Sequence, residues 1–281
     1  MIASISPTRP IVRYHGGKWR LAPWIISHFP AHRVYVEPFG GAASVLLRKP
    51  RSYAEIYNDL DGEIVNLFRV ARDRGEELLR AIELTPFARE EFDLSYQPDD
   101  CPVEQARRTM VRCGMGFGST AANSKHRTGF RGSATRSGSH PGGDWASLGD
   151  NLRTVANRLR GVIVENRDAM ELMRYHDGPE TLHYVDPPYL AATRTRLDGK
   201  GSYRHELSDD DHRELLCLIN DLRGMVVISG YPHPLYDEAL AGWHRVTKVA
   251  LTDGRGRRTE TLWISPNIPS QNLLPLTTNE H

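Results

Sequence analysis

The sequence predicts an α/β protein built on a mostly parallel β-sheet with helices on both faces. Strand-like and helix-like segments alternate through residues 33–76 and again from residue 161 onwards. This order is typical of parallel sheets, because a helix carries the chain back to the start of the next strand. The last two strand-like segments follow one another without a helix between them, which predicts a closing antiparallel pair.

The first part of the sheet is predicted from two short runs rich in Val, Ile and Tyr, RVYVEPF (33–39) and YAEIYND (53–59). Between them, GGAASVLLRKP (40–50) predicts a tight turn and then a helix that Pro50 ends. GEIVNLFRVARD (62–73) predicts the next helix, because its apolar residues recur at helical spacing.

The same alternation resumes after residue 160. The expected segments are a strand at 161–168, a helix at 169–176, a strand at 181–186, a helix at 208–224, a strand at 225–230 and the antiparallel pair 243–253 and 259–265. Ser208 is a suitable N-cap for its helix, and acidic residues fill the first helical turn. The basic turn GRGRR joins the last two strands.

Residues 77–160 interrupt the alternation and predict an insertion, helical at first. Its later part, 113–145, is rich in Gly, Ser and Arg and has no periodicity, so we expect it to lack regular structure. From Arg107 to Arg160 there are ten Lys/Arg and two Asp/Glu, a local net charge of +8. A basic loop facing water would explain this charge, but a polyanionic partner such as nucleic acid explains it better.

The composition of the 281-residue chain is that of an ordinary globular protein, with 39% hydrophobic and 25% charged residues. Its apolar runs are too short to predict a membrane span, and the N-terminus lacks the features of a signal peptide. Three scattered cysteines fit neither a disulfide scaffold nor a four-ligand zinc site. We therefore expect an intracellular protein.

Polar and Gly-rich motifs follow several of the predicted strands, where ligands bind in open parallel sheets. Gly40 and Gly41 allow a sharp turn, and Asp59 follows 19 positions after Gly40. An acid at this distance commonly accepts hydrogen bonds from ribose hydroxyls, which favours an adenosine-bearing cofactor. The motif lacks the G-x-G-x-x-G spacing of nicotinamide enzymes, and an ordinary tight turn is the alternative.

A third strand end carries the residues Asn166, Arg167 and Asp168, which could contact an adenine ring. Asp168 is explained equally well as the N-cap of the following helix.

The fourth strand end carries Asp186, Pro187, Pro188 and Tyr189, the sequence DPPY. The prolines cannot donate ladder hydrogen bonds, so the strand ends there. An exocyclic amine of a nucleobase has two N–H donors, which Asp186 and the carbonyl of Pro187 can both accept. Accepting both concentrates electron density on nitrogen, and Tyr189 offers a face on which the base stacks. Such a pocket requires the base to be flipped out of its duplex.

These motifs, taken in order, resemble the Dam-like DNA adenine-N6 methyltransferases, specifically their phage and prophage branch. The matching segments are RYHGGKW (13–19), EPFGGAAS (37–44), YNDLDGEIVNLFRV (57–70), TGFR (128–131), IVENRDAM (163–170), YVDPPYL (184–190), VVISGYPHPLY (226–236) and ETLWISP (260–266). The resemblance implies a Rossmann-like S-adenosylmethionine-dependent methyltransferase fold over 1–76 and 161–281, with 77–160 as the inserted DNA target-recognition region.

The resemblance also implies the roles of individual residues. Those expected to bind the cofactor S-adenosylmethionine are Tyr14, Lys18, Glu37, Phe39, Gly40, Gly41 and Asp59, with Asn166, Arg167 and Asp168 near the adenine ring. The DPPY residues hold the target adenine. Those expected to contact DNA are Lys125, Arg127, Arg131 and Arg136 in the insertion, and Arg194, Arg196, Tyr203 and Arg204 after the DPPY motif. Ala43 stands where the family's loop often has a third glycine, and Tyr14 where a tryptophan is common.

The expected reaction is methylation of adenine N6 in double-stranded DNA without a metal, with S-adenosylhomocysteine as product. A cytosine-N4 methyltransferase, an RNA methyltransferase and a non-catalytic DNA-binding module are the alternatives. The resemblance further implies a cytoplasmic monomer in a bacterial or phage-infected cell, with a cognate restriction enzyme as a possible partner.

Overall fold

The computed structural model describes residues 7–118, 127–132, 140–194, 203–252 and 256–267. Its strands are β1 (Val34–Glu37), β2 (Ala54–Asn58), β3 (Ile163–Glu165), β4 (Thr181–Val185), β5 (Met225–Gly230), β6 (His244–Thr252) and β7 (Gly256–Ile264). The α-helices are α1 (Ala22–Ile26), α2 (Gly62–Asp73), α3 (Gly75–Glu83), α4 (Arg89–Leu94), α5 (Pro102–Met115), α6 (Pro141–Ala146), α7 (Leu148–Leu159), α8 (Ala169–Tyr175), α9 (Asp209–Asp221) and α10 (Pro234–Ala239), and a short 3₁₀ turn spans Ala191–Thr193.

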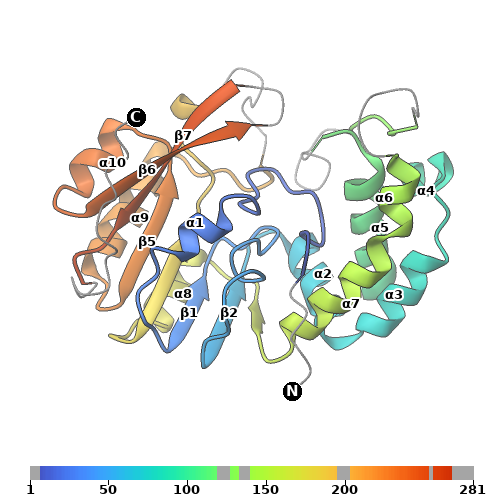
Figure 1. Ribbon diagram of the computed structural model, residues 1–281, viewed down its shortest axis with the longest axis horizontal. Helices are drawn as coiled ribbons and strands as arrows, with labels where there is room; N and C mark the ends of the chain where they lie inside the picture. The colour runs from blue at the N-terminus through green and yellow to red at the C-terminus, as the bar shows by residue number, and fades with distance from the viewer. Residues whose placement is uncertain (1–6, 119–126, 133–139, 195–202, 253–255, 268–281) are drawn as a thin grey trace.

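The strands form one seven-stranded sheet in the order β3-β2-β1-β4-β5-β7-β6. β1 to β5 are parallel, and β7 enters antiparallel between β5 and β6. Figure 1 shows the sheet with the β6–β7 hairpin at one end. The predicted mostly parallel sheet with a closing antiparallel pair is confirmed, and it has the strand order of a Rossmann-like methyltransferase fold.

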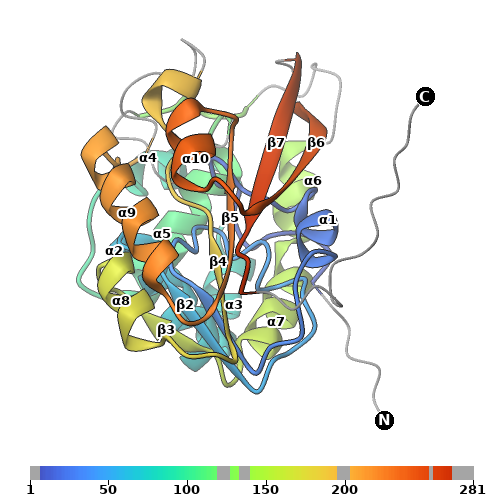
Figure 2. The ribbon, with the colours of Figure 1, turned by 90° about the vertical axis from the view of Figure 1, so that its left-hand side faces the viewer.

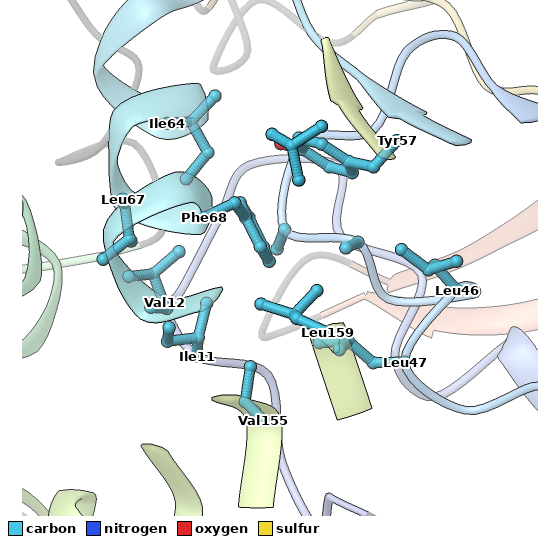
Figure 3. Close-up of a cluster of buried hydrophobic side chains, with 14 of the residues drawn as sticks. Ile11, Val12, Leu46, Leu47, Tyr57, Ile64, Leu67, Phe68, Val155 and Leu159 are labelled. Carbon is cyan, nitrogen blue, oxygen red and sulfur yellow. The ribbon is translucent and has the colours of Figure 1, made fainter. Parts of the chain in front are cut away.

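Two apolar clusters hold the sheet between helices. On one face, α9 and α10 pack against β5 through residues such as Leu216, Ile228 and Tyr236. The cluster on the other face gathers α1, α2 and α7, and Figure 3 shows its centre around Phe68 and Leu159. Figure 2 shows α9 and α10 across the sheet from α1. The sheet is thus covered on both faces, as the alternating pattern predicts.

Most of the predicted helices and strands occur where the sequence placed them. α2 spans the expected residues 62–73, and Asp61 caps it by accepting a hydrogen bond from the Glu63 N–H. The Ser208 side chain caps α9 in a reciprocal capping box with Asp211. These ends are determined locally, because the capping side chains satisfy N–H groups that have no partner inside the helix.

The predicted helix within residues 40–50 is wrong, because this segment is a series of turns. The N–H of Leu46 donates to the carboxylate of Glu37 at 2.9 Å instead of to a backbone carbonyl of a preceding turn. Ala43 has φ +51°, which is outside the right-handed helical region. A contact from a neighbouring strand therefore overrides the local helical preference.

The inserted region is a group of helices, α3 to α7, which lies beside α2 at one side of the molecule (Figure 1). The described parts of 113–145 are more regular at both ends than expected, since α5 continues to Met115 and α6 begins at Pro141. Between them, Gly116 and Phe130 form an antiparallel bridge. Side chains of α2, α5 and α7 share one apolar cluster, so the insertion packs directly onto the rest of the fold. Its role in target recognition stays a prediction.

Glu55 of β2 links the sheet to this helical group through an ion pair. Its side chain is 3% exposed, and its carboxylate lies 2.7 Å from Lys49 Nζ and 2.6 Å from Nη1 of Arg158 in α7. These hydrogen-bonded ion pairs lower the pKa of Glu55, although burial alone would raise it. A buried carboxylate with two cationic partners stabilises the native state only while all three groups are present.

We expect Glu55→Gln to lower the free energy of unfolding by about 3–5 kcal/mol, since it leaves buried cations without a counter-charge. Urea denaturation measures the loss. The matched control is Glu77→Gln, because Glu77 pairs with Arg74 at the surface of α3, at 56% side-chain exposure. The control should leave stability nearly unchanged, and an equally small effect for Glu55→Gln would contradict this account.

Candidate active site

A pocket opens at the carboxyl ends of β1, β2 and β4, where neighbouring parallel strands leave room for a ligand. The space inside it, counted together with the adjoining open solvent, is about 870 Å³. The loop at residues 14–18 and the segment 203–207 form its remaining walls. Segments far apart in the sequence therefore meet in one cavity.

The DPPY corner of the pocket is organised by a buried ion pair. Asp186 follows the end of β4, and its Oδ1 lies 3.0 Å from the Lys18 ammonium nitrogen. Ser229 of β5 donates a 2.7 Å hydrogen bond to the same oxygen. Burial alone would lower the pKa of Lys18, but the charges of Asp186 and Glu260 outweigh it and raise the pKa above its ordinary value. The ammonium is therefore charged at neutral pH.

Glu260 of β7 completes this corner from the antiparallel end of the sheet. It is 4% exposed, accepts a hydrogen bond from the hydroxyl of Tyr189, and lies 3.8 Å from the Lys18 ammonium. The same ammonium lies 4.6 Å from the centre of the Tyr189 ring, whose edge region meets Tyr231. Tyr189 is thus fixed at its hydroxyl and along its ring, and it does not line the pocket itself.

The Gly loop after β1 touches β2 so closely that side chains are excluded. A Cβ on Gly40 would lie 2.2 Å from the Tyr57 ring, and Gly41 has φ +47°. The Tyr57 hydroxyl donates to the carbonyl of Gly41 at 2.7 Å, and the N–H of Gly41 donates to Asp59 at 2.8 Å. These contacts fix the loop as one wall of the pocket, with Phe39 and Tyr14 beside it.

The acids of this wall have shifted pKa values. Burial raises the pKa of Asp59 to about 6, although its oxygens accept hydrogen bonds from the N–H groups of Gly41 and Asp61. Burial likewise raises the pKa of Glu37 to about 8, while the Tyr35 hydroxyl and the Leu46 N–H oppose the shift. Perturbed acids gathered in a cavity are typical of functional sites.

The predicted adenine-contacting residues lie beside the pocket and not in its lining. Asp168 caps α8, accepting hydrogen bonds from the N–H groups of Met170 and Glu171. Asn166 donates to the carbonyl of Asp59 at 2.8 Å, and the backbone of Arg167 exchanges hydrogen bonds with the side chain of Asn58. Asn166 and Arg167 thus hold the chain at Asn58 and Asp59 in place through hydrogen bonds. Contact of Asn166, Arg167 or Asp168 with a cofactor stays a prediction.

Two of the arginines expected to contact DNA from the insertion are paired with acids of the protein. Arg127 is exposed and bonds to Asp93, and Arg131 lies 3.6 Å from Asp144. The remaining two insertion residues, Lys125 and Arg136, lie outside the described residues.

Of the residues expected to contact DNA after the DPPY motif, the two described arginines are paired with acids of the protein. Arg194 is 6% exposed at its side chain, pairs with Glu206 at 2.7 Å and donates to the carbonyl of Tyr189. Arg204 lies 3.1 Å from both Asp61 and Glu63. Tyr203 and Arg204 line the pocket. Arg196 lies outside the described residues.

Sequence reasoning missed three residues that the structure brings to the site: Asp61, Ser229 and Glu260. Glu260 had a usable signal, because the two-residue period of a strand places it on the same face as the buried Leu262 and Ile264. A charge on an apolar strand face indicates a buried partner. Ser229 had a weaker signal, a single hydroxyl within the apolar run MVVISG.

The described residues show neither a metal-binding cluster nor a membrane-spanning helix. No group of three or more His, Cys, Asp or Glu side chains there is arranged to hold a metal ion. No helix among these residues is long and apolar enough to span a membrane.

Comparison with known proteins decides the family. Residues 14–223 match the model of the D12 class N6 adenine-specific DNA methyltransferases. The match covers three quarters of the chain and includes the residues that line the pocket. The chain belongs to this family. The adenine-methyltransferase resemblance of the motifs is thereby confirmed, and members of such a family use S-adenosylmethionine to modify DNA. The narrower assignment to a phage and prophage branch stays a prediction.

Two relatives illustrate the range of similarity within the methyltransferases. A DNA adenine methylase of Serratia marcescens is 32% identical over 102 residues, which cover 32% of this chain and 37% of that protein. The chain thus spans little more than a third of this relative. A Type II methyltransferase, M1.LlaDCHI of Lactococcus lactis subsp. cremoris, is 27% identical over 288 residues, covering 90% of this chain and 94% of that protein.

We expect Gly40→Ala to weaken binding of S-adenosylhomocysteine at least tenfold, because the added Cβ would overlap the buried Tyr57 ring and displace the loop. Calorimetric titration measures the affinity. Gly178→Ala is the control, since its Cβ would meet only Thr181 Oγ1 at an ordinary 3.6 Å. Equal affinities of the two variants would show that the tight approach of Gly40 to Tyr57 is not required.

Proposed function

We propose that this methyltransferase transfers a methyl group from S-adenosylmethionine to N6 of an adenine flipped out of double-stranded DNA, at a specific site. The observation that carries the proposal is the DPPY corner. There the carboxylate of Asp186 is held at the pocket by Lys18 and Ser229, and the carbonyl of Pro187 follows directly in the chain.

The chain's own residues fit the cofactor. Gly40 and Gly41 let the loop lie against the Tyr57 and Tyr14 rings and form one wall of the pocket, and the adjacent Asp59 carboxylate suits the hydroxyl donors of a ribose. Ser44 Oγ is buried at the pocket without a hydrogen-bond partner among the described residues, which favours a polar ligand there. When bound, S-adenosylmethionine supplies a methyl group activated by its sulfonium charge.

Asp186 and Pro187 orient and activate the amine in this proposal. The described contacts of Asp186 are both on Oδ1, so Oδ2 is the oxygen we assign to one amine N–H. The carbonyl of Pro187 accepts the other N–H. As the N–C bond forms and the S–C bond breaks, N6 gives up a proton to Asp186 or to water through it. Lys18 holds the Asp186 carboxylate in place as an acceptor, with its ammonium nitrogen 3.0 Å from Oδ1.

Tyr189 contributes to this mechanism through its contacts with Glu260 and Lys18. Its hydroxyl bonds to Glu260 and its ring lies against Lys18, so it fixes the strand end from which Asp186 projects. Stacking of the flipped base on Tyr189, which the motif predicted, would require its ring to become accessible when DNA binds. The helical insertion 77–160 remains our candidate for target recognition, supported by its net charge of +8 between Arg107 and Arg160.

A cytosine-N4 methyltransferase would use the same amine chemistry, but the family match favours adenine. The name of the Lactococcus relative, a Type II methyltransferase, supports a role in restriction–modification. A partner endonuclease and a monomeric state belong to the proposal.

Asp186→Asn should lower the methylation rate by about 10²–10³-fold or more, because the amide replaces an ionised acceptor. Affinity for S-adenosylhomocysteine should change only a few-fold. Digestion of DNA from a methylation-free host and nucleoside analysis measure the product, which we expect to be N6-methyladenine. Asp237→Asn is the control, since Asp237 lies outside the pocket lining and pairs with Arg245. N4-methylcytosine as product, or full activity of Asp186→Asn, would contradict the proposal.

The raised pKa of Asp59 predicts pH-dependent cofactor binding. Ribose hydroxyls bind best to the ionised carboxylate, so the dissociation constant of S-adenosylhomocysteine should rise below about pH 6, by up to about tenfold per pH unit. Asp59→Asn should weaken binding and reduce this dependence, while Glu37 and Asp61, whose pKa values burial also raises, stay in the same pocket. In the ligand-free protein the sign is opposite, because a pKa raised from 3.8 to about 6 destabilises the fold as pH increases through that interval. Wild-type affinity that is constant from pH 5 to 8 would place the ribose elsewhere.

A further inference from the structure

Asp61 has a buried oxygen that the protein does not satisfy. The residue is 2% exposed, and its Oδ1 accepts hydrogen bonds from the Glu63 N–H at 3.0 Å and from Arg204 Nη1 at 3.1 Å. Its Oδ2 is buried and has no hydrogen-bond partner among the described residues. A buried carboxylate oxygen without a donor is costly, so such an atom in a native fold indicates a donor from beyond the described residues, such as a ligand.

The unsatisfied oxygen belongs to a residue of the cofactor pocket. Asp61 lines the cavity together with Asp59, whose two oxygens already accept backbone N–H groups from Gly41 and Asp61. A ligand in this pocket is therefore well placed to supply the donor that Asp61 lacks.

We propose that Asp61 is a second cofactor-binding carboxylate, whose Oδ2 accepts a hydrogen bond from a hydroxyl or ammonium group of S-adenosylmethionine. Arg204 acts as a positioning residue, because its hydrogen bond to Oδ1 leaves Oδ2 for the cofactor. The inference rests on the proposed function, since it takes the cofactor of that function as the ligand. It assigns Arg204 an internal role in place of the DNA contact expected from the sequence.

The arrangement also links the cofactor to the helical insertion. Arg204 lies 3.1 Å from Glu63, and Glu63 bonds in turn to Arg112 of α5. Arg112 is 8% exposed at its side chain, whereas Glu63 and Arg204 are 27% and 30% exposed, so this chain of charges runs from the partly exposed pocket edge to the interior of the insertion. The orientation of Asp61 is thereby tied to the helix group that we assign to DNA.

Calorimetric titration of S-adenosylhomocysteine without DNA tests the proposal. Asp61→Asn should weaken binding about tenfold or more, because the amide presents an NH₂ group where the ligand requires an acceptor. Asn is also a good N-cap, so α2 should form in the variant. Ligand-free Asp61→Asn should melt near the wild-type temperature, because a neutral amide costs less to bury than the carboxylate, whose pKa burial raises, while the ion pair with Arg204 is lost.

Asp99→Asn is the matched control. Asp99 likewise accepts a hydrogen bond from the N–H two residues later, at 2.9 Å, and pairs with an arginine, Arg108, at 2.9 Å, but it lies outside the pocket lining. Its affinity should equal that of the wild type. Arg204→Gln should weaken binding as well, whereas Arg204→Lys should restore part of it.

A parallel titration with 5′-methylthioadenosine, which has the ribose but lacks the amino acid, distinguishes the ribose hydroxyl from the ammonium group as the donor. An equal loss in Asp61→Asn assigns the ribose hydroxyl, and no loss assigns the ammonium. A folded Asp61→Asn with wild-type affinity for S-adenosylhomocysteine would overturn this inference alone. Failure of the wild type to bind S-adenosylhomocysteine would instead overturn the proposed function.

Discussion

The ammonium group of Lys18 lies in the interior between the carboxylates of Asp186 and Glu260, and the catalytic corner is built around it. These groups come from the N-terminal loop, the end of β4 and the antiparallel strand β7. A buried cation requires counter-charges close by, and each buried carboxylate in turn requires the cation. These ion pairs hold Asp186 at the end of the sheet. Ser229 of β5 adds a hydrogen bond to Oδ1 of Asp186.

The opposite wall of the pocket balances charge in a similar way. Arg204 pairs with Asp61 and Glu63, while Asp59 and Glu37 have no arginine or lysine in hydrogen-bond contact among the described residues and show raised pKa values. Burial favours their neutral forms until a donor or a cation approaches. S-adenosylmethionine brings both, in its ribose hydroxyls and its positively charged sulfonium and ammonium groups. A pocket with surplus carboxylates is therefore suited to this ligand, and its affinity should depend on pH.

The features that the sequence predicted well are those determined by neighbouring residues. The strand β5 follows from a continuous apolar run, the helix α2 follows from apolar periodicity, and the Ser208 capping box begins α9 at the expected residue. The DPPY strand end follows from the chemistry of proline. The helix expected within residues 40–50 did not form, because Leu46 donates to Glu37 of the neighbouring β1, a contact that no local pattern records.

The predictions that depended on distant residues were less complete. Glu260 reaches Tyr189 across 71 positions of the chain, and only the register of β7 brings it there. Arg194 and Arg204 carry the positive charge that DNA contact requires, yet both are paired with acids of the protein, Glu206 and Asp61. Local sequence indicates which residues can carry charge, but pairing in space decides which charges remain for a ligand.

A structure of the protein with S-adenosylhomocysteine and a duplex containing the target adenine tests the central claim most directly. The account predicts an extruded adenine whose N6 lies within about 3 Å of both the Asp186 carboxylate and the Pro187 carbonyl, with Lys18 still paired to Asp186. An adenine that remains stacked in the duplex, or an amine bound away from Asp186 while the DPPY corner stays closed, would contradict it.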